Sequence, residues 1–403
     1  MKTIFFAAGA TIPFFEPKLS TQSITDAVCS QQNWENIINQ LKQEKSGTPI
    51  YNPINDITTL RGLGLNFEQI AEVIDKIASL NIHPNPIANN PLGIIARMLN
   101  WQVPYEGWIY VPFLYREIIA RYILDLEDNH KRNNYDALIE KQRNFINSVK
   151  TVSGDDCSII SLNYDNCVKN SLNGLGIEHY FNGQNSELDI NNFMNSSNVV
   201  YYPHGHICFK FTDNRNISYY QDPHIAKAER WNGIVNSVNT HATLPFIDGQ
   251  FALNFNTFIT TGKTKDEALN NLPYAVYYQR MAIDFFKSDT IYIIGYSFSD
   301  EHFNRLLKTY IACRRGRLVI VNHYPDDVTM TNEYMDEYNI IRKIYDVFKP
   351  EWDILLDNEG TVHPFDQQEI DRINNQGWGN IFDNVTFYKK GYEDFLNEYH
   401  NVM

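Results

Sequence analysis

Five short apolar runs, each ending in glycine or in polar residues, constrain the fold of this 403-residue chain most strongly. They lie at about residues 2–8, 158–162, 198–203, 290–295 and 317–322. Short runs rich in β-branched and aromatic residues are typical of strands that are buried on both faces of a parallel sheet. Helical patterns separate the later runs, at 277–287 and from about 300 to 313. This alternation of strand and helix predicts an α/β fold with a parallel sheet.

Two other stretches differ from this alternation. Between about residues 31 and 150, apolar residues have helical spacing at 36–41, 67–77 and 114–126, with loops rich in asparagine and proline between them. We interpret 31–150 as a helical insertion and 331–403 as a mostly helical C-terminal extension, which includes a helical pattern at 332–348 and a short closing strand and helix within 384–400. The sheet domain is then expected to comprise 1–30 and 151–330, with a second excursion at 210–275.

Composition excludes several classes of protein. The net charge of −14 disfavours direct binding to nucleic acid, which needs an excess of lysine and arginine. The five cysteines form no C-x-x-C pair, so we expect no zinc ribbon. The run Ile4 to Ala8 is too short for a signal sequence or a membrane span. An odd number of cysteines without a signal peptide predicts reduced thiols and a cytoplasmic protein.

Polar clusters follow three of the predicted strands directly. They are Asn163-Tyr164-Asp165, His204-Gly205-His206 and the run from Gly295 to Asp300. Ligands of open α/β sheets bind outside the carboxyl ends of the strands. We therefore expect these clusters to meet in one crevice, where an asparagine, an aspartate and a histidine point to chemistry.

Several residues of these clusters also have a structural interpretation. Asn163 could hold a ribose hydroxyl or a water, or it could start a turn. Asp165 could bind a ligand, or it could cap the helix that follows. His204 could act as a general base near neutral pH. His206 raises the possibility of a metal site, but no carboxylate or cysteine at ligand spacing supports one, so we interpret it as a packing or loop residue.

The remaining strand ends are equally open to two interpretations. Gly9, Ala10 and Thr11 form a small-residue turn that could cradle a pyrophosphate or could be a plain strand-to-loop turn. Ser297 lies in a run of small residues before Asp300, which we expect to cap a helix. Asn322 could bind a ribose or could be a turn residue.

Taken in order, these residues resemble the sirtuin fold, and more closely the bacterial sirtuin-like proteins that consume NAD. Ala7 to Thr11 stands in place of the sirtuin Gly-Ala-Gly-x-Ser turn, and Ser161 to Asp165 stands in place of Thr-Gln-Asn-x-Asp. His204-Gly205, Gly295-Tyr296-Ser297 and Val321-Asn322 match three further strand ends. The runs 295–302 and 261–274 are similar to the bacterial group. The resemblance covers about 1–30 and 151–325, and it implies a Rossmann-like doubly wound sheet of sirtuin type.

The resemblance also implies roles for these residues. Asn163 would sit at the nicotinamide ribose and help to place a water, and His204 would be the base. Asp165 would hold the carboxamide. The other cofactor-binding positions would be Gly9, Ala10 and Thr11 at the phosphates, and Gly295, Ser297 and Asn322, the last two at the adenosine half.

Two departures from the sirtuin pattern shape the predicted function. Leu162 replaces the usual glutamine, and the zinc-binding cysteines are missing, so no zinc is expected. Both disfavour a protein deacylase or an ADP-ribosyltransferase. The prediction is an NAD hydrolase that releases nicotinamide and ADP-ribose. The main alternative is a catalytically silent subunit that senses NAD or ADP-ribose or serves as a scaffold.

The resemblance finally implies a setting. Bacterial proteins of this kind resemble anti-phage defence effectors that deplete NAD. Since a constitutive hydrolase would be toxic, we expect gating by homo-oligomerisation or by a partner, for which a HerA-type DNA-translocating ATPase is the candidate.

Overall fold

A computed structural model describes the fold of most of the chain. The described residues are 1–45, 50–81, 110–154, 156–182, 187–211, 217–239, 272–313, 316–324, 343–344, 347, 367–382 and 384–403. The predicted helical pattern at 332–348 and the run 261–271 lie mostly or wholly outside them.

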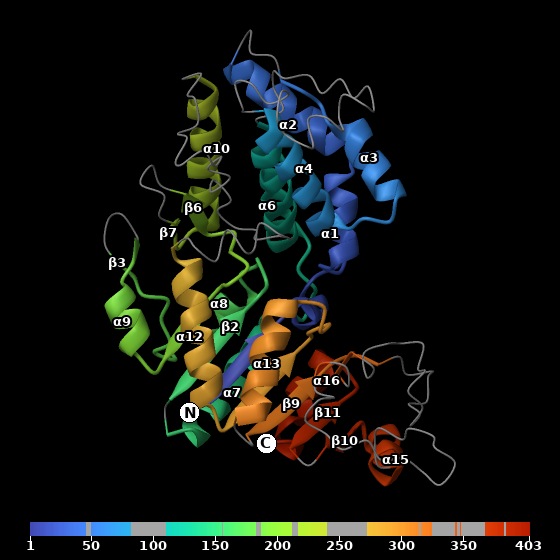
Figure 1. The fold of residues 1–403 in the computed structure, drawn as a ribbon, viewed down its shortest axis with the longest axis vertical. Helices are drawn as coiled ribbons and strands as arrows, with labels where there is room; N and C mark the ends of the chain where they lie inside the picture. Colours follow the sequence, from blue (N-terminus) through green and yellow to red (C-terminus); the bar gives the residue numbers. More distant parts are fainter. Residues whose placement is uncertain are drawn as a thin grey trace.

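A seven-stranded sheet forms the centre of the molecule (Figure 1). Its order is β10-β11-β9-β8-β1-β2-β5, and all neighbours are parallel except β10 and β11. The strands are β1 (Lys2–Phe6), β2 (Cys157–Ser161), β5 (Val199–Tyr201), β8 (Thr290–Ile294), β9 (Arg317–Val321), β10 (Trp378–Phe382) and β11 (Val385–Tyr388). The five predicted strands and the Rossmann-like α/β class are therefore confirmed.

The chain winds outward from β1 in both directions. It first adds β2 and β5 on one side, and it then returns to add β8 and β9 on the other. The strand order therefore reverses between β1 and β8, which is where ligands bind in doubly wound sheets.

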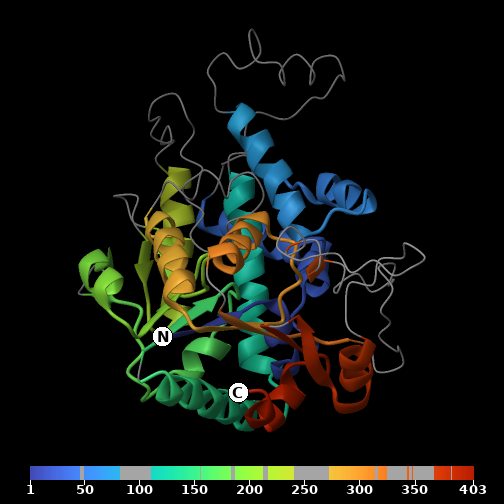
Figure 2. The ribbon, with the colours of Figure 1, turned by 60° about the horizontal axis from the view of Figure 1, so that its bottom comes forward.

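Alternate side chains of β1 pack against helices on opposite faces of the sheet. Phe5 contacts Phe285 of α12 (Tyr274–Lys287) and Phe303 of α13 (Glu301–Cys313). Phe6 contacts Tyr392 of α16 (Tyr392–Glu398), which packs beside α7 (Tyr135–Val152) on the other face (Figure 2). Both faces are thus covered, which explains why the strands read as continuous apolar runs.

The C-terminal region contributes strands as well as helices. β11 and α16 correspond to the predicted closing strand and helix. β10 was not predicted, and it pairs antiparallel with β11 after α15 (Gln367–Gln376). This hairpin extends the parallel sheet beyond β9 by two strands.

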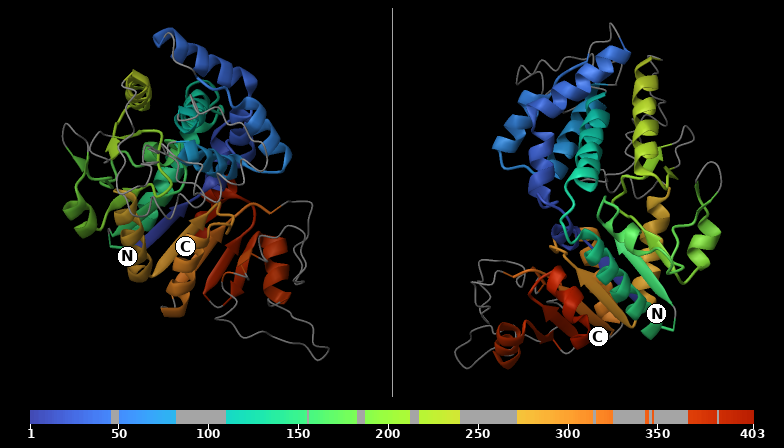
Figure 3. Two further views of the ribbon diagram at one scale, coloured as in Figure 1. Left: turned by 45° about the horizontal axis from the view of Figure 1, so that its top comes forward. Right: turned by 180° about the vertical axis from the view of Figure 1, so that it is seen from behind.

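A group of helices lies beyond the carboxyl ends of the strands (Figures 1 and 3). It consists of α1 (Thr21–Val28), α2 (Gln31–Glu44), α3 (Ile54–Gly62), α4 (Phe67–Asn81), α6 (Val111–Asn129) and α10 (Pro223–Asn239). α6 is central and contacts α1, α2, α4 and α10. A buried ion pair of 2.6 Å between Arg116 and Asp75 joins α6 to α4. The boundaries predicted for the helical insertion remain a prediction.

Short elements complete the described fold. α8 (Cys167–Ser171) follows β2, and α9 (Ile190–Asn195) precedes β5. Two small hairpins lie outside the central sheet, β3 (Phe181–Asn182) with β4 (Glu187–Leu188) and β6 (Phe209–Phe211) with β7 (Ile217–Tyr219). Among the described helices, none has the length and apolar character that a membrane span requires.

Candidate functional site

A cavity of about 310 Å³ lies at the carboxyl ends of β1, β2, β5 and β8. It lies at the lower end of the size range of small-molecule sites. Its lining combines strand-end residues with residues from the helical group. The strand-end residues in the lining are Ala7, Ala8, Gly9, Thr11, Leu162, Asn163, Tyr164, Asp165, His204, Gly295, Tyr296, Ser297, Ser299 and Asp300. The predicted meeting of the three polar clusters in one crevice is confirmed.

The ends of β1 and β8 touch through their backbones. Gly9 donates its N–H to the Gly295 carbonyl at 3.0 Å, and a Cβ on Gly9 would lie 2.7 Å from the Gly295 Cα. Gly295 has φ +67°, and a Cβ there would lie 2.3 Å from the Ala10 nitrogen. Both glycines are therefore required by this close approach at the switch point.

The amides of the β1 turn are occupied by the protein itself. Ala10 donates to the Ala7 carbonyl at 2.8 Å, and Thr11 donates to the Ala8 carbonyl at 3.2 Å. Ala10 is buried outside the cavity lining. These bonds support the interpretation as a structural turn, and the phosphate role of residues 9–11 remains a prediction.

The loop after β2 places Asn163 and Asp165 in the cavity lining. Both side chains are buried, and the side-chain amide of Asn163 forms no hydrogen bond within the described part of the chain, whereas its backbone N–H donates to Ser161 Oγ at 3.2 Å. Asp165 Oδ1 accepts from the Cys167 N–H at 2.9 Å at the start of α8, so the capping role, one of its two interpretations, is observed. Asp165 Oδ2 is buried without a hydrogen-bond partner among the described residues. One oxygen of Asp165 thus serves the fold and the other remains available to a ligand.

Burial raises the pKa of Asp165, while the hydrogen bond from the Cys167 amide opposes this rise. Behind the loop, the buried Glu127 of α6 accepts from the Asn166 N–H and from its Nδ2, both at 2.6 Å. Burial, together with the nearby charge of Asp165, raises the pKa of Glu127 to about 7. Two buried carboxyl groups therefore flank the turn at Asn166.

His204 is paired with a carboxylate that is distant in sequence. Its Nε2 lies 3.1 Å from Asp300 Oδ2, and both side chains are 8% exposed. Asp300 Oδ1 also accepts from the His302 N–H at 3.0 Å, so Asp300 caps α13 as predicted. An Nε2–H that donates to Asp300 leaves Nδ1 as the basic nitrogen of a neutral imidazole. Asp300 was predicted as a cap only, and its pairing with His204 is visible only in the folded chain.

His206 is buried and structural, as expected. Its Nδ1 accepts from the Cys208 N–H at 3.2 Å, so its Nε2–H donates to the Asp165 carbonyl at 2.9 Å. Burial lowers its pKa well below the usual value, so the ring is neutral. His206 therefore holds the backbone of Asp165, two residues from a histidine that faces the cavity.

The predicted residues of the adenosine half lie at the rim or outside the cavity. Ser297 is exposed, lines the cavity and is hydrogen-bonded to Ser299 at 2.7 Å. Asn322 is not part of the lining, and it donates from Nδ2 to the Tyr296 carbonyl at 2.9 Å. Asn322 thus supports the loop after β8, and its contact with a ligand remains a prediction.

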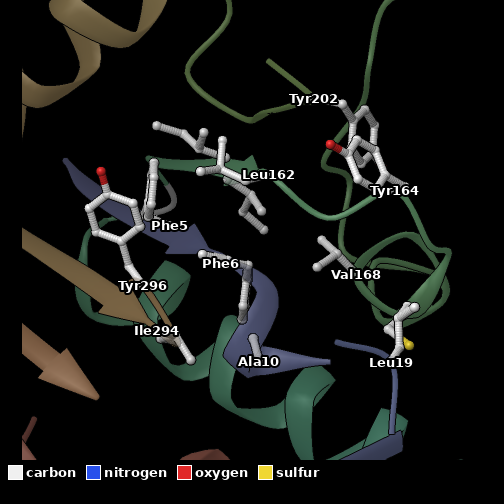
Figure 4. Packing of buried hydrophobic residues seen from close by; sticks show 14 of the residues in the cluster. Phe5, Phe6, Ala10, Leu19, Leu162, Tyr164, Val168, Tyr202, Ile294 and Tyr296 are labelled. Carbon is white, nitrogen blue, oxygen red and sulfur yellow. The ribbon is translucent and has the colours of Figure 1, made fainter. Parts of the chain in front are cut away.

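The floor of the cavity is apolar. Figure 4 shows Phe5 and Phe6 of β1 packed among Leu162, Ile294 and Tyr296. Leu162 and Tyr296 also line the cavity, as does Leu19 from the segment before α1. This part of the lining is therefore apolar.

The opposite wall comes from the helical group and was missed by sequence reasoning. It is formed by Leu19, Ser20, Thr21 and Ile24 around the start of α1 and by Asn66, Phe67 and Glu68 at the start of α4. No local pattern in residues 66–68 distinguishes them from an ordinary start of a helix. Only the packing of α4 against α1 and α6 brings them to the strand ends.

No group of three or more histidine, cysteine, aspartate or glutamate side chains within the described residues has metal-binding geometry. Cys29, Cys157, Cys167 and Cys208 are free thiols.

The comparison with known families adds an independent finding. Residues 157–341 match the family model of the SIR2-like domain, a sirtuin-like family. The matched segment carries Asn163, Asp165, His204, Gly295 and Asp300, whereas β1 and the helical wall lie outside it. No curated protein sequence matches the chain. SIR2-like domains bind NAD and are in general NAD-dependent enzymes, so an NAD-related function fits this part of the chain.

Proposed function

With a SIR2-like domain as the premise, we propose that this protein hydrolyses NAD to nicotinamide and ADP-ribose. The observation that carries the proposal is the cavity that holds Asn163, Asp165 and the His204–Asp300 pair together. An amide, a carboxylate with one unpartnered oxygen and an oriented imidazole are the groups that this reaction needs.

The cavity suits the nicotinamide end of the substrate. Asp165 Oδ2 is buried and can accept a hydrogen bond from the carboxamide NH₂ group. The described lining contains three carboxylates, Glu68, Asp165 and Asp300, and neither lysine nor arginine. Such a lining favours the positively charged pyridinium ring over the pyrophosphate.

The remaining residues supply the water and accept its proton. Asn163 would orient a water toward the ribose carbon, and His204 would take a proton from that water at Nδ1. The bond between the ribose carbon and the ring nitrogen breaks, and its electron pair leaves with nicotinamide. The water oxygen forms the new bond to the ribose carbon. Positive charge develops on the ribose in the transition state, and the carboxylates of the lining would stabilise it.

The biological setting is proposed on the resemblance alone. We propose an anti-phage effector in the cytoplasm that is kept inactive until it forms a homo-oligomer or meets a partner, with a HerA-type ATPase as the candidate. Gel filtration that shows a monomer with full activity by itself would contradict this gating.

The first test is a chromatographic assay of NAD incubated with purified protein, with and without a co-purified partner. Asn163→Ala and His204→Ala are compared with the matched control His224→Ala, whose histidine is exposed and outside the cavity. Nicotinamide and ADP-ribose from the wild type and the control, but not from the other two variants, would support the proposal. Binding of NAD without turnover under every condition would instead favour a sensing or scaffold subunit.

A further inference from the structure

The helical wall brings one carboxylate to the cavity, that of Glu68. It lies in the first turn of α4, whose start is held by several hydrogen bonds. Asn66 Oδ1 accepts from the N–H groups of Glu68 and Gln69, both at 3.0 Å. The Phe67 N–H donates to Thr25 Oγ1 of α1 at 3.1 Å, and the Phe67 carbonyl accepts from the Tyr115 hydroxyl of α6 at 2.7 Å. The backbone that carries Glu68 is therefore anchored on two sides before any ligand binds.

Among the residues that the structure describes, the Glu68 side chain has no partner that would explain its position. It is half-buried, and it forms no hydrogen bond or ion pair within the described part of the chain. By contrast, Glu72 on the same helix is paired with Lys76 at 2.5 Å. The charge of Glu68 adds to the effect of burial in raising the pKa of Tyr164, which also lines the cavity. The Glu68 carboxylate thus lies near the loop that carries Asp165.

The distribution of charge in the cavity lining sets Glu68 apart from an acidic residue that merely occupies the first turn of a helix. Of the three carboxylates in the lining, Asp300 is paired with His204. Within the described residues, Asp165, which is 1% exposed, has an unpartnered oxygen, and Glu68 is unpaired. No lysine or arginine of the described lining neutralises either group. Two uncompensated carboxylates beside an apolar floor favour a ligand group that carries positive charge.

We infer that Glu68 and Asp165 form a subsite for the pyridinium cation, and that Glu68 makes the protein select oxidised NAD over NADH. This inference rests on the proposed function, because it assigns the same cavity to the nicotinamide end. The oxidised ring carries a positive charge that the reduced ring lacks, whereas the rest of the two molecules is the same. Glu68 therefore discriminates by charge, from a wall that lies outside the SIR2-like segment.

The test measures binding without turnover. Dissociation constants for NAD and NADH are determined by calorimetry in a His204→Ala background. We expect NAD to bind at least fivefold more tightly than NADH. Adding Glu68→Gln is expected to reduce this ratio at least threefold, chiefly by weakening NAD binding. The matched control Glu72→Gln removes a carboxylate from the same helix outside the cavity lining, and it should leave the ratio unchanged.

A second variant separates charge from structure. Glu68→Lys should favour NADH relative to the background, while thermal denaturation reports whether α4 still packs. An unchanged ratio in both Glu68 variants, with both ligands still binding, would overturn the inference and leave the proposed hydrolase intact. If the wild-type protein binds neither ligand and releases no nicotinamide, both the inference and the proposed function are overturned. If Glu68→Gln reduces the preference for NAD over NADH but the wild type never releases nicotinamide, the subsite is supported and the proposed hydrolysis is contradicted.

Discussion

The two walls of the cavity are built in different ways. The sheet wall carries Asn163, Asp165, His204 and Gly295 at the ends of parallel strands, each directly after an apolar run. The helical wall carries Asn66 and Glu68 at the start of α4, a helix that is distant in sequence from the strand ends of the site. Strand register places the first set, and packing between helices places the second. The sequence therefore predicts the residues of the sheet wall, whereas the residues of the helical wall become evident only in the folded chain.

Substitutions that remove the chemistry of the sheet wall should have the largest effect. His204→Ala is expected to lower kcat for NAD cleavage roughly a thousandfold, which corresponds to about 4 kcal/mol. Asn66→Ala, on the helical wall, should lower kcat only a few-fold, because Asn66 is assigned no part in the reaction. Steady-state kinetics on both variants would check this contrast. Equal losses of kcat in the two variants would contradict the assignment of the chemistry to the sheet wall alone.

The contact between β1 and β8 should be the next most sensitive feature. Gly295→Ala places a Cβ at φ +67° and 2.3 Å from the Ala10 nitrogen. The left-handed conformation and the overlap together should reduce the free energy of unfolding by about 3 kcal/mol. Urea denaturation measures this loss. Gly233→Ala is the control, because nothing lies within 4 Å of a Cβ there. A loss no larger than that of Gly233→Ala would show that the close approach is not required.

Glu127 links α6 to the loop at Asn166 and should make stability depend on pH. The pKa of its carboxyl is raised to about 7 in the folded state from 4.5. The folded state therefore holds the proton more tightly, and the contribution to stability is lost as pH rises through 7. We expect the wild type to lose about 2 kcal/mol more than Glu127→Gln between pH 5 and pH 8. Urea unfolding at several pH values checks this, and parallel curves for the two proteins would contradict it.

The smallest predicted effect concerns the residue that orients the base. Asp300→Asn keeps an oxygen that can cap α13 but loses the carboxylate that accepts from His204 Nε2. We expect kcat to fall about tenfold, because the imidazole is less well held in the productive tautomer. KM should change less than twofold and the melting temperature should be preserved. A rise in KM with kcat unchanged would place Asp300 in binding rather than in positioning the base.

Much of the sheet could be predicted because its signals are local. An apolar run of about five residues that ends in glycine or a polar residue indicates a buried strand, and all five such predictions were confirmed. β10 was missed because Trp378–Phe382 alternates with polar residues and glycine, and its pairing with β11 becomes evident only in the folded sheet. The cap at Asp300 was predicted for the same local reason, and the cap at Asp165 was one of its two interpretations.

The sequence alone determined which residues stand at the strand ends, because strand periodicity and capping act over a few residues. It also indicated that His204 and His206 would differ, since no carboxylate or cysteine at ligand spacing supports a metal site at His206. Only the tertiary structure decided that Asp300 pairs with His204 across 96 positions, and that α4 carries Glu68 to the cavity. These contacts depend on how strands and helices pack over long distances in the chain, and no pattern within a short stretch of residues encodes that packing.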